Sequence, residues 1–211
     1  MLTMPTFLLL LLLLTLTTAC SGRHVTPAAA DGPSALVASA CSRARFPGPC
    51  VRALAHASPR TPTDLAVASV AASLSSARSA ASALRSAAPS PLPGPLRDCL
   101  QQLSDSADQL ERTRAELSRL QRPRAARAHG GMQLDNACTW VSAALTNEDT
   151  CLDAAKGLPA GAVRDAVTTR VRALEKETSN ALYFVTHLGS DGTPDLTVHF
   201  DSPPLFLTWR A

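Results

Sequence analysis

Aromatic residues are scarce in this sequence of 211 residues, where they make up 4% and include a single tyrosine. The apolar content of 45% is therefore supplied mostly by Ala, Leu and Val. Sandwich and barrel strands favour β-branched and aromatic residues, whereas Ala and Leu are among the best helix formers. The composition predicts closely packed helices and argues against a β-sandwich or barrel.

The sequence also lacks a large excess of charge of either sign, since the formal net charge is +3. So small a charge gives no support for binding to nucleic acid or to an anionic membrane. The sequence has no Cys-x-x-Cys pair with zinc partners and no haem-attachment motif, so we expect no metal and no cofactor. It also has no nucleophile elbow, Gly-rich phosphate loop or Ser/His/Asp arrangement, so we expect no enzyme activity.

Residues 1–19 have the pattern of a secretory signal peptide. A run made almost entirely of Leu, from Phe7 to Leu16, precedes the small residues Thr17, Thr18 and Ala19. This run is about half the ~20 residues that a membrane-spanning helix needs. We therefore expect secretion, with residues 20–32 as a flexible N-terminus. The alternative is a lipoprotein with a lipid on Cys20.

Removal of the signal peptide leaves Cys41, Cys50, Cys99, Cys138 and Cys151, with Cys20 in addition if it is retained. The odd count of five implies at least one free thiol or intermolecular bond. Cys41 and Cys50 enclose eight residues, and Phe46-Pro47-Gly48-Pro49 favours a turn between them. Two short helices joined by this turn and one bridge would gain roughly 3 kcal/mol.

Four longer stretches have helical patterns. The first begins at Thr61-Pro62-Thr63-Asp64, where Thr61 can cap the helix and Pro62 suits the first position, and it ends before Pro89. Apolar residues recur at helical spacing in the other three. Their ranges are Leu96 to Leu120, Asn136 to Leu152 and Val163 to Val185.

Two regions lack this pattern. Residues 121–131 form a basic stretch with Arg122, Arg124 and Arg127, which we interpret as a solvated connection between helices. Residues 187–211 contain several Gly and Pro residues and no helical period, so we expect an irregular tail.

Four segments, in the same order along the chain, resemble the plant invertase and pectin methylesterase inhibitor family. They cover about residues 33–186, which we take as one domain. They are the Cys41–Cys50 hairpin, Leu96-Arg97-Asp98-Cys99-Leu100 followed by Asp105-Ser106-Ala107-Asp108, Thr139-Trp140 through Thr150-Cys151, and Ser179-Asn180-Ala181-Leu182.

The resemblance implies an all-α fold, with an N-terminal helical hairpin followed by an up-and-down four-helix bundle. It also implies disulfides between Cys41 and Cys50 and between Cys99 and Cys151. Cys138 departs from the family pattern and is a competing partner for Cys99. The residues around Cys151 match the family motif, which favours Cys151.

Members of this family act by binding an enzyme. The resemblance implies a protein secreted into the plant cell wall, or apoplast, that covers the substrate cleft of pectin methylesterase in a one-to-one complex. It would thereby regulate pectin de-esterification. The contact positions carried over by motif are Gln101, Asp105, Asp108, Thr150 and Asp153.

Two alternatives come from the same family. Invertase inhibitors often carry Pro-Lys-Phe before the fourth cysteine, and this sequence has no such tripeptide, which favours pectin methylesterase as the target. Many pectin methylesterases carry the same domain as a pro-region, so the chain could be a truncated proenzyme. The residues after Thr186 are too few for a catalytic β-helix, so we expect no esterase activity. A small lipid-binding bundle is a further alternative.

Overall fold

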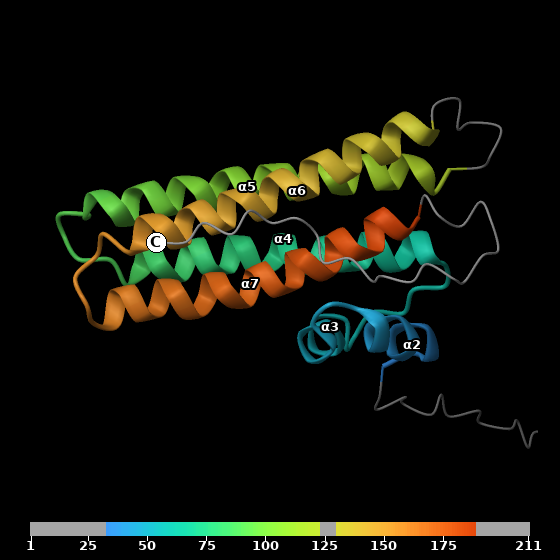
Figure 1. The fold of residues 1–211 in the computed structure, drawn as a ribbon, viewed down its shortest axis with the longest axis horizontal. Helices are drawn as coiled ribbons and strands as arrows, with labels where there is room; N and C mark the ends of the chain where they lie inside the picture. The colour runs from blue at the N-terminus through green and yellow to red at the C-terminus, as the bar shows by residue number, and fades with distance from the viewer. Residues whose placement is uncertain (1–32, 123–129, 189–211) are drawn as a thin grey trace, which may run out of the picture. The chain divides into compact units, whose positions relative to one another are not determined.

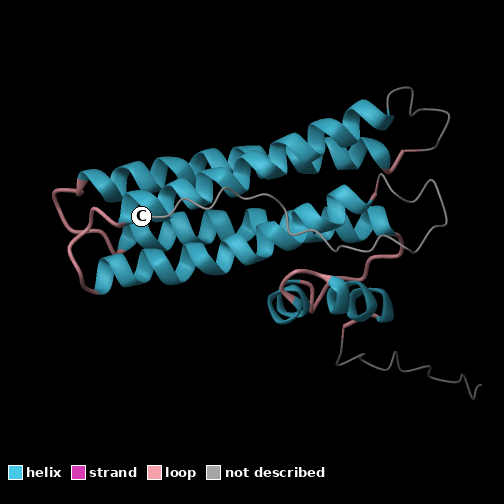
Figure 2. Ribbon diagram, viewed as in Figure 1, coloured by secondary structure: helices cyan, strands magenta, loops and turns pink. Residues whose placement is uncertain are grey.

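The computed structural model describes residues 33–122 and 130–188, all of which belong to one compact unit. These residues form helices and loops and no strand (Figure 2). The predicted signal peptide, the N-terminus to residue 32 and the tail from residue 189 lie outside them. The helices are α2 (Ala35–Arg43), α3 (Pro47–Ala53), α4 (Pro62–Ser86), α5 (Gly94–Leu120), α6 (Gly130–Ala155) and α7 (Ala162–His187).

The four long helices, α4 to α7, form an up-and-down bundle (Figure 1). Helix α5 packs against α4 and α6, and α7 packs against the same two helices. The α5/α6 pair and the α4/α7 pair therefore form opposite sides of the bundle. The all-α fold predicted from the sequence is confirmed. No helix among the described residues is long and apolar enough to cross a membrane.

The core of the bundle combines a leucine-rich helix with a helix of small residues. Leucines recur every seven residues on α5, and all are fully buried. The buried face of α4 includes the small residues Ala66, Ser69, Ser73, Ala77 and Ala80. The hydroxyl of Ser73 donates to the Ser69 carbonyl at 3.2 Å, so a buried polar group is satisfied within the helix. The α5 leucines are Leu96, Leu103, Leu110 and Leu117.

The start of α4 is fixed by the predicted cap. The Thr61 hydroxyl accepts a hydrogen bond from the Asp64 backbone N–H at 3.0 Å, and Asp64 Oδ2 accepts one from the Thr61 N–H at 3.1 Å. Gln121, at the end of α5, donates to Asp64 Oδ1 at 2.8 Å. This hydrogen bond is the main cause of a lowered pKa of the Asp64 carboxyl; burial opposes it, and hydrogen bonds from Thr61 and the Arg60 backbone lower the pKa further.

The last three helices are longer than predicted, and α6 differs most. Helix α6 begins at Gly130, inside the predicted loop, and six residues before the predicted start at Asn136. The two glycines each cost about 1 kcal/mol in a helix interior, but here they occupy the first turn, and Leu134 behind them packs against the core. Helix α7 likewise continues through His187.

The α2–α3 hairpin packs its apolar residues into the core of the bundle, and one side chain of α7 also hydrogen-bonds to its turn. Asn180 Nδ2 donates to the Phe46 carbonyl at 2.9 Å, and Asn180 Oδ1 accepts from the Phe46 N–H, also at 2.9 Å. Phe46 lies in the turn between the hairpin helices, which the Cys41–Cys50 disulfide joins. Asn180 is almost fully buried. It therefore satisfies both backbone polar groups of the turn at the place where the turn meets the bundle.

The second disulfide joins α5 to α6 through Cys99 and Cys151. Both cysteines are fully buried, and the pairing is the one that the family resemblance implies. Cys138 is a free, half-buried thiol. It precedes Cys151 by thirteen residues on the same helix, which is about 20 Å at 1.5 Å per residue. Cys138 therefore does not compete for Cys99 in this fold.

Replacing Asn180 with Asp should weaken the attachment of the hairpin. The substitution removes the N–H donor and places a carboxylate oxygen against the Phe46 carbonyl, which should cost about 2 kcal/mol of unfolding free energy. Urea denaturation measures this loss, and hydrogen exchange locates it in residues 35–53. The matched control, Asn136→Asp on the partly exposed start of α6, should change stability little. Equal losses in the two variants would contradict the role assigned to Asn180.

Removing the Cys99–Cys151 bridge should cost more than removing the hairpin bridge. The two bridges close sequence separations of 52 and 9 residues. Loop-closure entropy then gives about 4 kcal/mol for the long loop and about 3 kcal/mol for the short one. Denaturation of the two paired Cys→Ala variants tests the order. The Cys138→Ala variant, which breaks no bridge, is the control, and a loss equal to that of the long bridge would contradict the assignment.

Candidate partner-binding surface

Three of the predicted contact residues lie along one side of α5. Gln101, Asp105 and Asp108 are spaced by four and three residues, which places them on a common helix face. Gln101 and Asp108 are exposed, and Asp105 is partly exposed. Gln101 Nε2 donates to Asp105 Oδ1 at 2.9 Å. The amide thereby orients the Asp105 carboxylate before any partner binds.

Arg112 shows which neighbouring helix borders this side of α5. It follows Asp105 by seven residues, which is close to two helical turns, so both side chains point to the same side. The Arg112 guanidinium lies 4.9 Å from the centroid of the Trp140 ring on α6, in a cation–π contact. The side of α5 that carries Asp105 therefore borders α6.

The two remaining predicted residues, Thr150 and Asp153, lie on α6 beside the interhelical disulfide. Because Cys99 is bonded to Cys151, Gln101 and Thr150 lie at the same level of the two antiparallel helices. The Thr150 hydroxyl donates to the Thr146 carbonyl at 2.8 Å, and its oxygen is exposed as an acceptor. Asp153 is exposed and pairs with Lys156 Nζ at 2.5 Å.

All five predicted residues thus lie on the outer side of two neighbouring, cross-linked helices. Helical rotation places Asp105 and Thr150 about 100–120° from the bridging cysteine of their own helix, nearest the groove between α5 and α6. The other three lie farther around their helices. We call this surface the α5/α6 face, and it comprises Gln101, Asp105, Asp108, Arg112, Trp140, Thr150 and Asp153.

A buried carboxyl group lies directly behind the α5/α6 face. Glu148 of α6 is fully buried, and its Oε1 accepts hydrogen bonds from Ser106 of α5 at 2.8 Å and from Thr178 of α7 at 2.9 Å. Its Oε2 is also shut off from solvent and has no hydrogen-bond partner among the described residues. Burial raises the pKa of Glu148 to about 8, against the opposing effect of the two hydrogen bonds.

The sequence analysis did not single out this residue. The signal was present in the spacing. Val141, Ala144, Glu148 and Cys151 recur at three or four residues, and all four are fully buried. Position 148 therefore belongs to the buried stripe of α6, and Glu148 is the ionisable residue in a stripe that is otherwise apolar.

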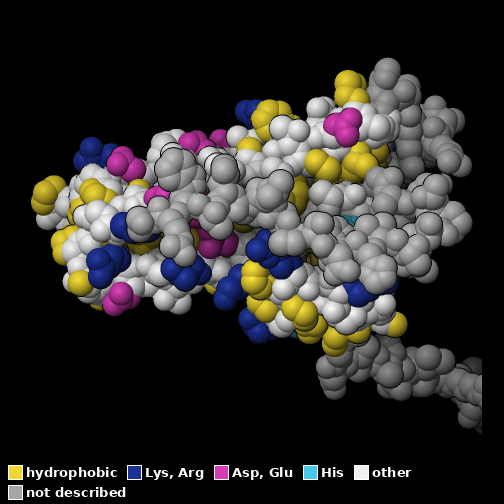
Figure 3. Space-filling view, in the orientation of Figure 1, with side chains coloured by type: hydrophobic (Ala, Val, Ile, Leu, Met, Phe, Trp, Pro, Cys, Tyr) yellow, Lys and Arg dark blue, Asp and Glu magenta, His cyan; other side chains and the backbone are white. Residues whose placement is uncertain are grey.

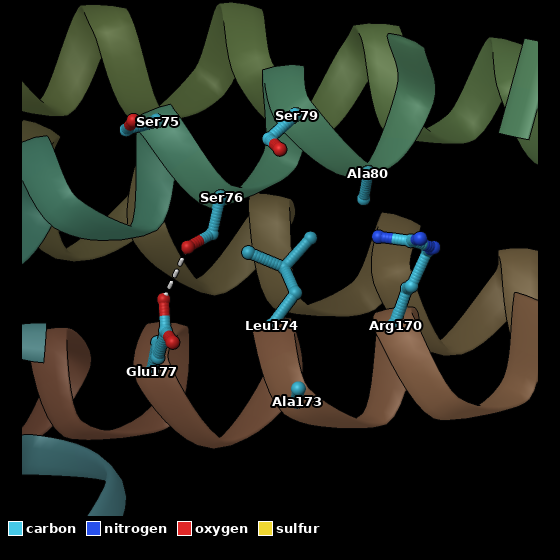
Figure 4. A pocket seen from close by; sticks show the side chains of 8 residues that line it. All are labelled: Ser75, Ser76, Ser79, Ala80, Arg170, Ala173, Leu174 and Glu177. Carbon is cyan, nitrogen blue, oxygen red and sulfur yellow. Dashed lines mark hydrogen bonds between the residues drawn. The ribbon is translucent and has the colours of Figure 1, made fainter. Parts of the chain in front are cut away.

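A polar groove of about 310 Å³ lies on the opposite side of the bundle, between α4 and α7. Figure 4 shows the Ser76 hydroxyl pointing toward Glu177, to which it donates at 2.6 Å, with Arg170 farther along α7. Burial raises the pKa of Glu177, while the Ser76 hydrogen bond and the charge of Arg52 lower it. The groove is lined by Ser75, Ser76, Ser79, Ala80, Arg170, Ala173, Leu174 and Glu177.

Charges of both signs are mixed on the surface over α7. Figure 3 shows Lys and Arg side chains along this helix with Asp and Glu side chains between them. Arg170 and Arg172 are followed in the sequence by Glu175, Lys176 and Glu177. This face therefore has no extended field of a single sign. Among the described residues, no group of three His, Cys, Asp or Glu side chains is arranged to bind a metal ion.

The amino-acid sequence of this chain is similar to those of known plant proteins. Pectinesterase inhibitor 3 of Arabidopsis thaliana is 36% identical over 175 residues, which cover 79% of this chain and 82% of the relative. Probable pectinesterase/pectinesterase inhibitor 34 of the same plant is 30% identical over 175 residues, which cover 78% of this chain and 28% of that longer relative.

A solved structure has the same fold. The crystal structure of mutant form A of a pectin methylesterase inhibitor from Arabidopsis superposes with a TM-score of 0.55, at 19% identity, over 69% of this chain and 92% of that one. The family described as plant invertase/pectin methylesterase inhibitor matches residues 35–184, from the first described helix almost to the end of α7. The chain belongs to the plant invertase/pectin methylesterase inhibitor family.

Proposed function

We propose that this protein inhibits pectin methylesterase by binding it, and that it is not itself an enzyme. The observation that carries this proposal is the 36% identity to a pectinesterase inhibitor over about four fifths of both chains. The family match extends over the whole bundle. An inhibitor of this kind would regulate the removal of methyl esters from cell-wall pectin.

The α5/α6 face is the surface that we propose for contact with the esterase. Its two helices are cross-linked by Cys99–Cys151, so little conformational freedom is lost when a partner binds. Gln101 orients Asp105 in advance, and Thr150 presents an exposed oxygen beside them. Together these groups present oriented hydrogen-bond acceptors on two cross-linked helices. We propose a one-to-one complex in which this face covers the substrate cleft.

Secretion to the apoplast fits the covalent structure of the chain. Disulfides form and persist in oxidising compartments, and the two bridges join α2 to α3 and α5 to α6. The target that we propose is found in the cell wall. An extracellular location therefore places inhibitor and enzyme in the same compartment.

Acid invertase is the second candidate target, because the family name includes both enzymes. The 36% identical relative is named as a pectinesterase inhibitor, which favours the esterase. The truncated pro-region of an esterase is not favoured, since the chain also matches 82% of the length of that inhibitor. Titration of the oxidised chain against both enzymes in parallel, from about pH 5 to 7, separates the two targets.

The double variant Asp105→Ala, Asp108→Ala should weaken inhibition of pectin methylesterase. Loss of charge-assisted hydrogen bonds costs about 1.5–3 kcal/mol for each contact made, so an increase in Ki of tenfold or more is expected. The measurement is residual esterase activity against inhibitor concentration at fixed salt.

The control for this experiment is Asp165→Asn, which removes an exposed carboxylate at the start of α7, away from the α5/α6 face. Its Ki should be unchanged, and circular dichroism should show that both variants are folded. Unchanged potency in the Asp105/Asp108 variant would remove these residues from the contact surface. Inhibition of invertase alone would overturn the choice of target.

A further inference from the structure

The Glu148 carboxyl joins three helices of the bundle through a single oxygen atom. Helix α6 supplies Glu148, α5 supplies the donor Ser106, and α7 supplies the donor Thr178. All three side chains are fully buried. Both hydroxyls donate to Oε1, which therefore uses both of its lone pairs, whereas Oε2 has no partner among the described residues.

This arrangement matches a neutral carboxylic acid better than a carboxylate. In the acid, Oε1 is the carbonyl oxygen with two acceptor sites, and Oε2 carries the proton. In the ion, the negative charge is shared by both oxygens, and half of it would lie on an atom that is shut off from solvent and has no donor among the described residues. Burying an ionised carboxylate without pairing it is far more costly than burying its neutral form.

The charges that act most strongly on Glu148 among the described residues are those of Glu175 and Glu177 on α7, and both disfavour its ionisation. On α5 the carboxylates at this level, Asp105 and Asp108, lie on the outer side of the helix.

Helix α4 and the hairpin do not supply the missing cation. Helix α4 has two arginines, and one of them, Arg78, pairs with Glu111 at 3.3 Å on the surface. The other, Arg85, lies exposed in the last turn of that helix. Arg52 of the hairpin acts on Glu177. The surroundings of Glu148 therefore favour retention of its proton.

We propose that Glu148 stabilises the bundle in its protonated form. The protein is then most stable in an acidic environment, and the packing of α5, α6 and α7 weakens as the surroundings become alkaline. This inference does not depend on the identity of the target enzyme. This weakening would affect the α5/α6 face, because Ser106 is next to Asp105 and Glu148 is two residues from Thr150.

The direction of the effect follows from proton linkage. The pKa of Glu148 is about 8 in the folded chain, against an ordinary value of 4.5. Between these values the folded state binds one proton more than the unfolded state, so stability falls as pH rises. The stabilisation is complete below about pH 4.5 and is lost as pH passes through about 8. The folding constant should fall roughly tenfold per pH unit, or about 100-fold from pH 5 to pH 7.

Urea denaturation of the full oxidised chain at pH 5, 6, 7 and 8 tests this proposal, because urea is uncharged and leaves the electrostatics intact. The wild-type protein should lose stability across the series. Glu148→Gln should flatten the dependence, since an amide oxygen can accept from both Ser106 and Thr178 and does not titrate. The proposal is overturned if Glu148→Gln loses stability with pH as steeply as the wild type.

Glu175→Gln is the matched control. Burial and then the charge of Asp149 raise the pKa of this partly buried carboxyl on α7, so it contributes in the same direction. Most of the pH dependence should nevertheless remain in this variant, because Glu175 is only partly buried whereas Glu148 is fully buried. A flat profile in Glu175→Gln, with the slope unchanged in Glu148→Gln, would assign the effect to Glu175 and reject the proposal.

A direct measurement does not require any variant to fold. The chain contains five glutamates, at positions 111, 116, 148, 175 and 177. Carboxyl-¹³C labelling of Glu therefore gives a simple NMR titration of the native protein. One carboxyl should remain protonated at pH 7 and titrate near pH 8. If every Glu carboxyl is ionised at pH 7 in the folded chain, the proposal fails.

Discussion

The bond between Cys99 and Cys151 sets the level at which α5 meets α6, and the proposed contact surface depends on that level. A slide of one helical turn, about 5.4 Å, would separate Gln101 from Thr150 and Ser106 from Glu148. The cation–π contact of Arg112 with Trp140 lies farther along the same helix pair. Covalent linkage at one point and side-chain contacts at two others thus fix the register of these helices.

The hairpin depends on a different kind of constraint. Its own disulfide closes α2 onto α3, and its position on the bundle comes from apolar packing together with the two hydrogen bonds between Asn180 and the Phe46 backbone. A side-chain amide can provide a donor and an acceptor at once, which a carboxylate or a hydroxyl in the same place would not do with this geometry. This accounts physically for an asparagine on the buried face of α7.

Much of the fold was predictable from the sequence. The leucine period of α5 and the Thr61–Asp64 cap are local signals, and each led to the correct helix. The start of α6 at Gly130 was not predicted, because glycine propensity disfavours a helix there and tertiary packing of Leu134 outweighs it. For the site, spacing placed Gln101, Asp105 and Asp108 on one face. That α6 borders this face rests on the Arg112–Trp140 contact, which involves two helices and is not encoded locally.

The free thiol of Cys138 could in principle attack a disulfide of the same molecule by thiol–disulfide exchange. Burial, and then the charge of Asp135, raises the pKa of this thiol above its ordinary value. Thiol–disulfide exchange requires the thiolate, and attack also requires access along the line of the S–S bond. Cys138 has little thiolate near neutral pH and lies several turns from Cys151 on a continuous helix. Within the part of the chain that the structure describes, Cys138 is therefore poorly placed to attack the Cys99–Cys151 bridge of the folded protein.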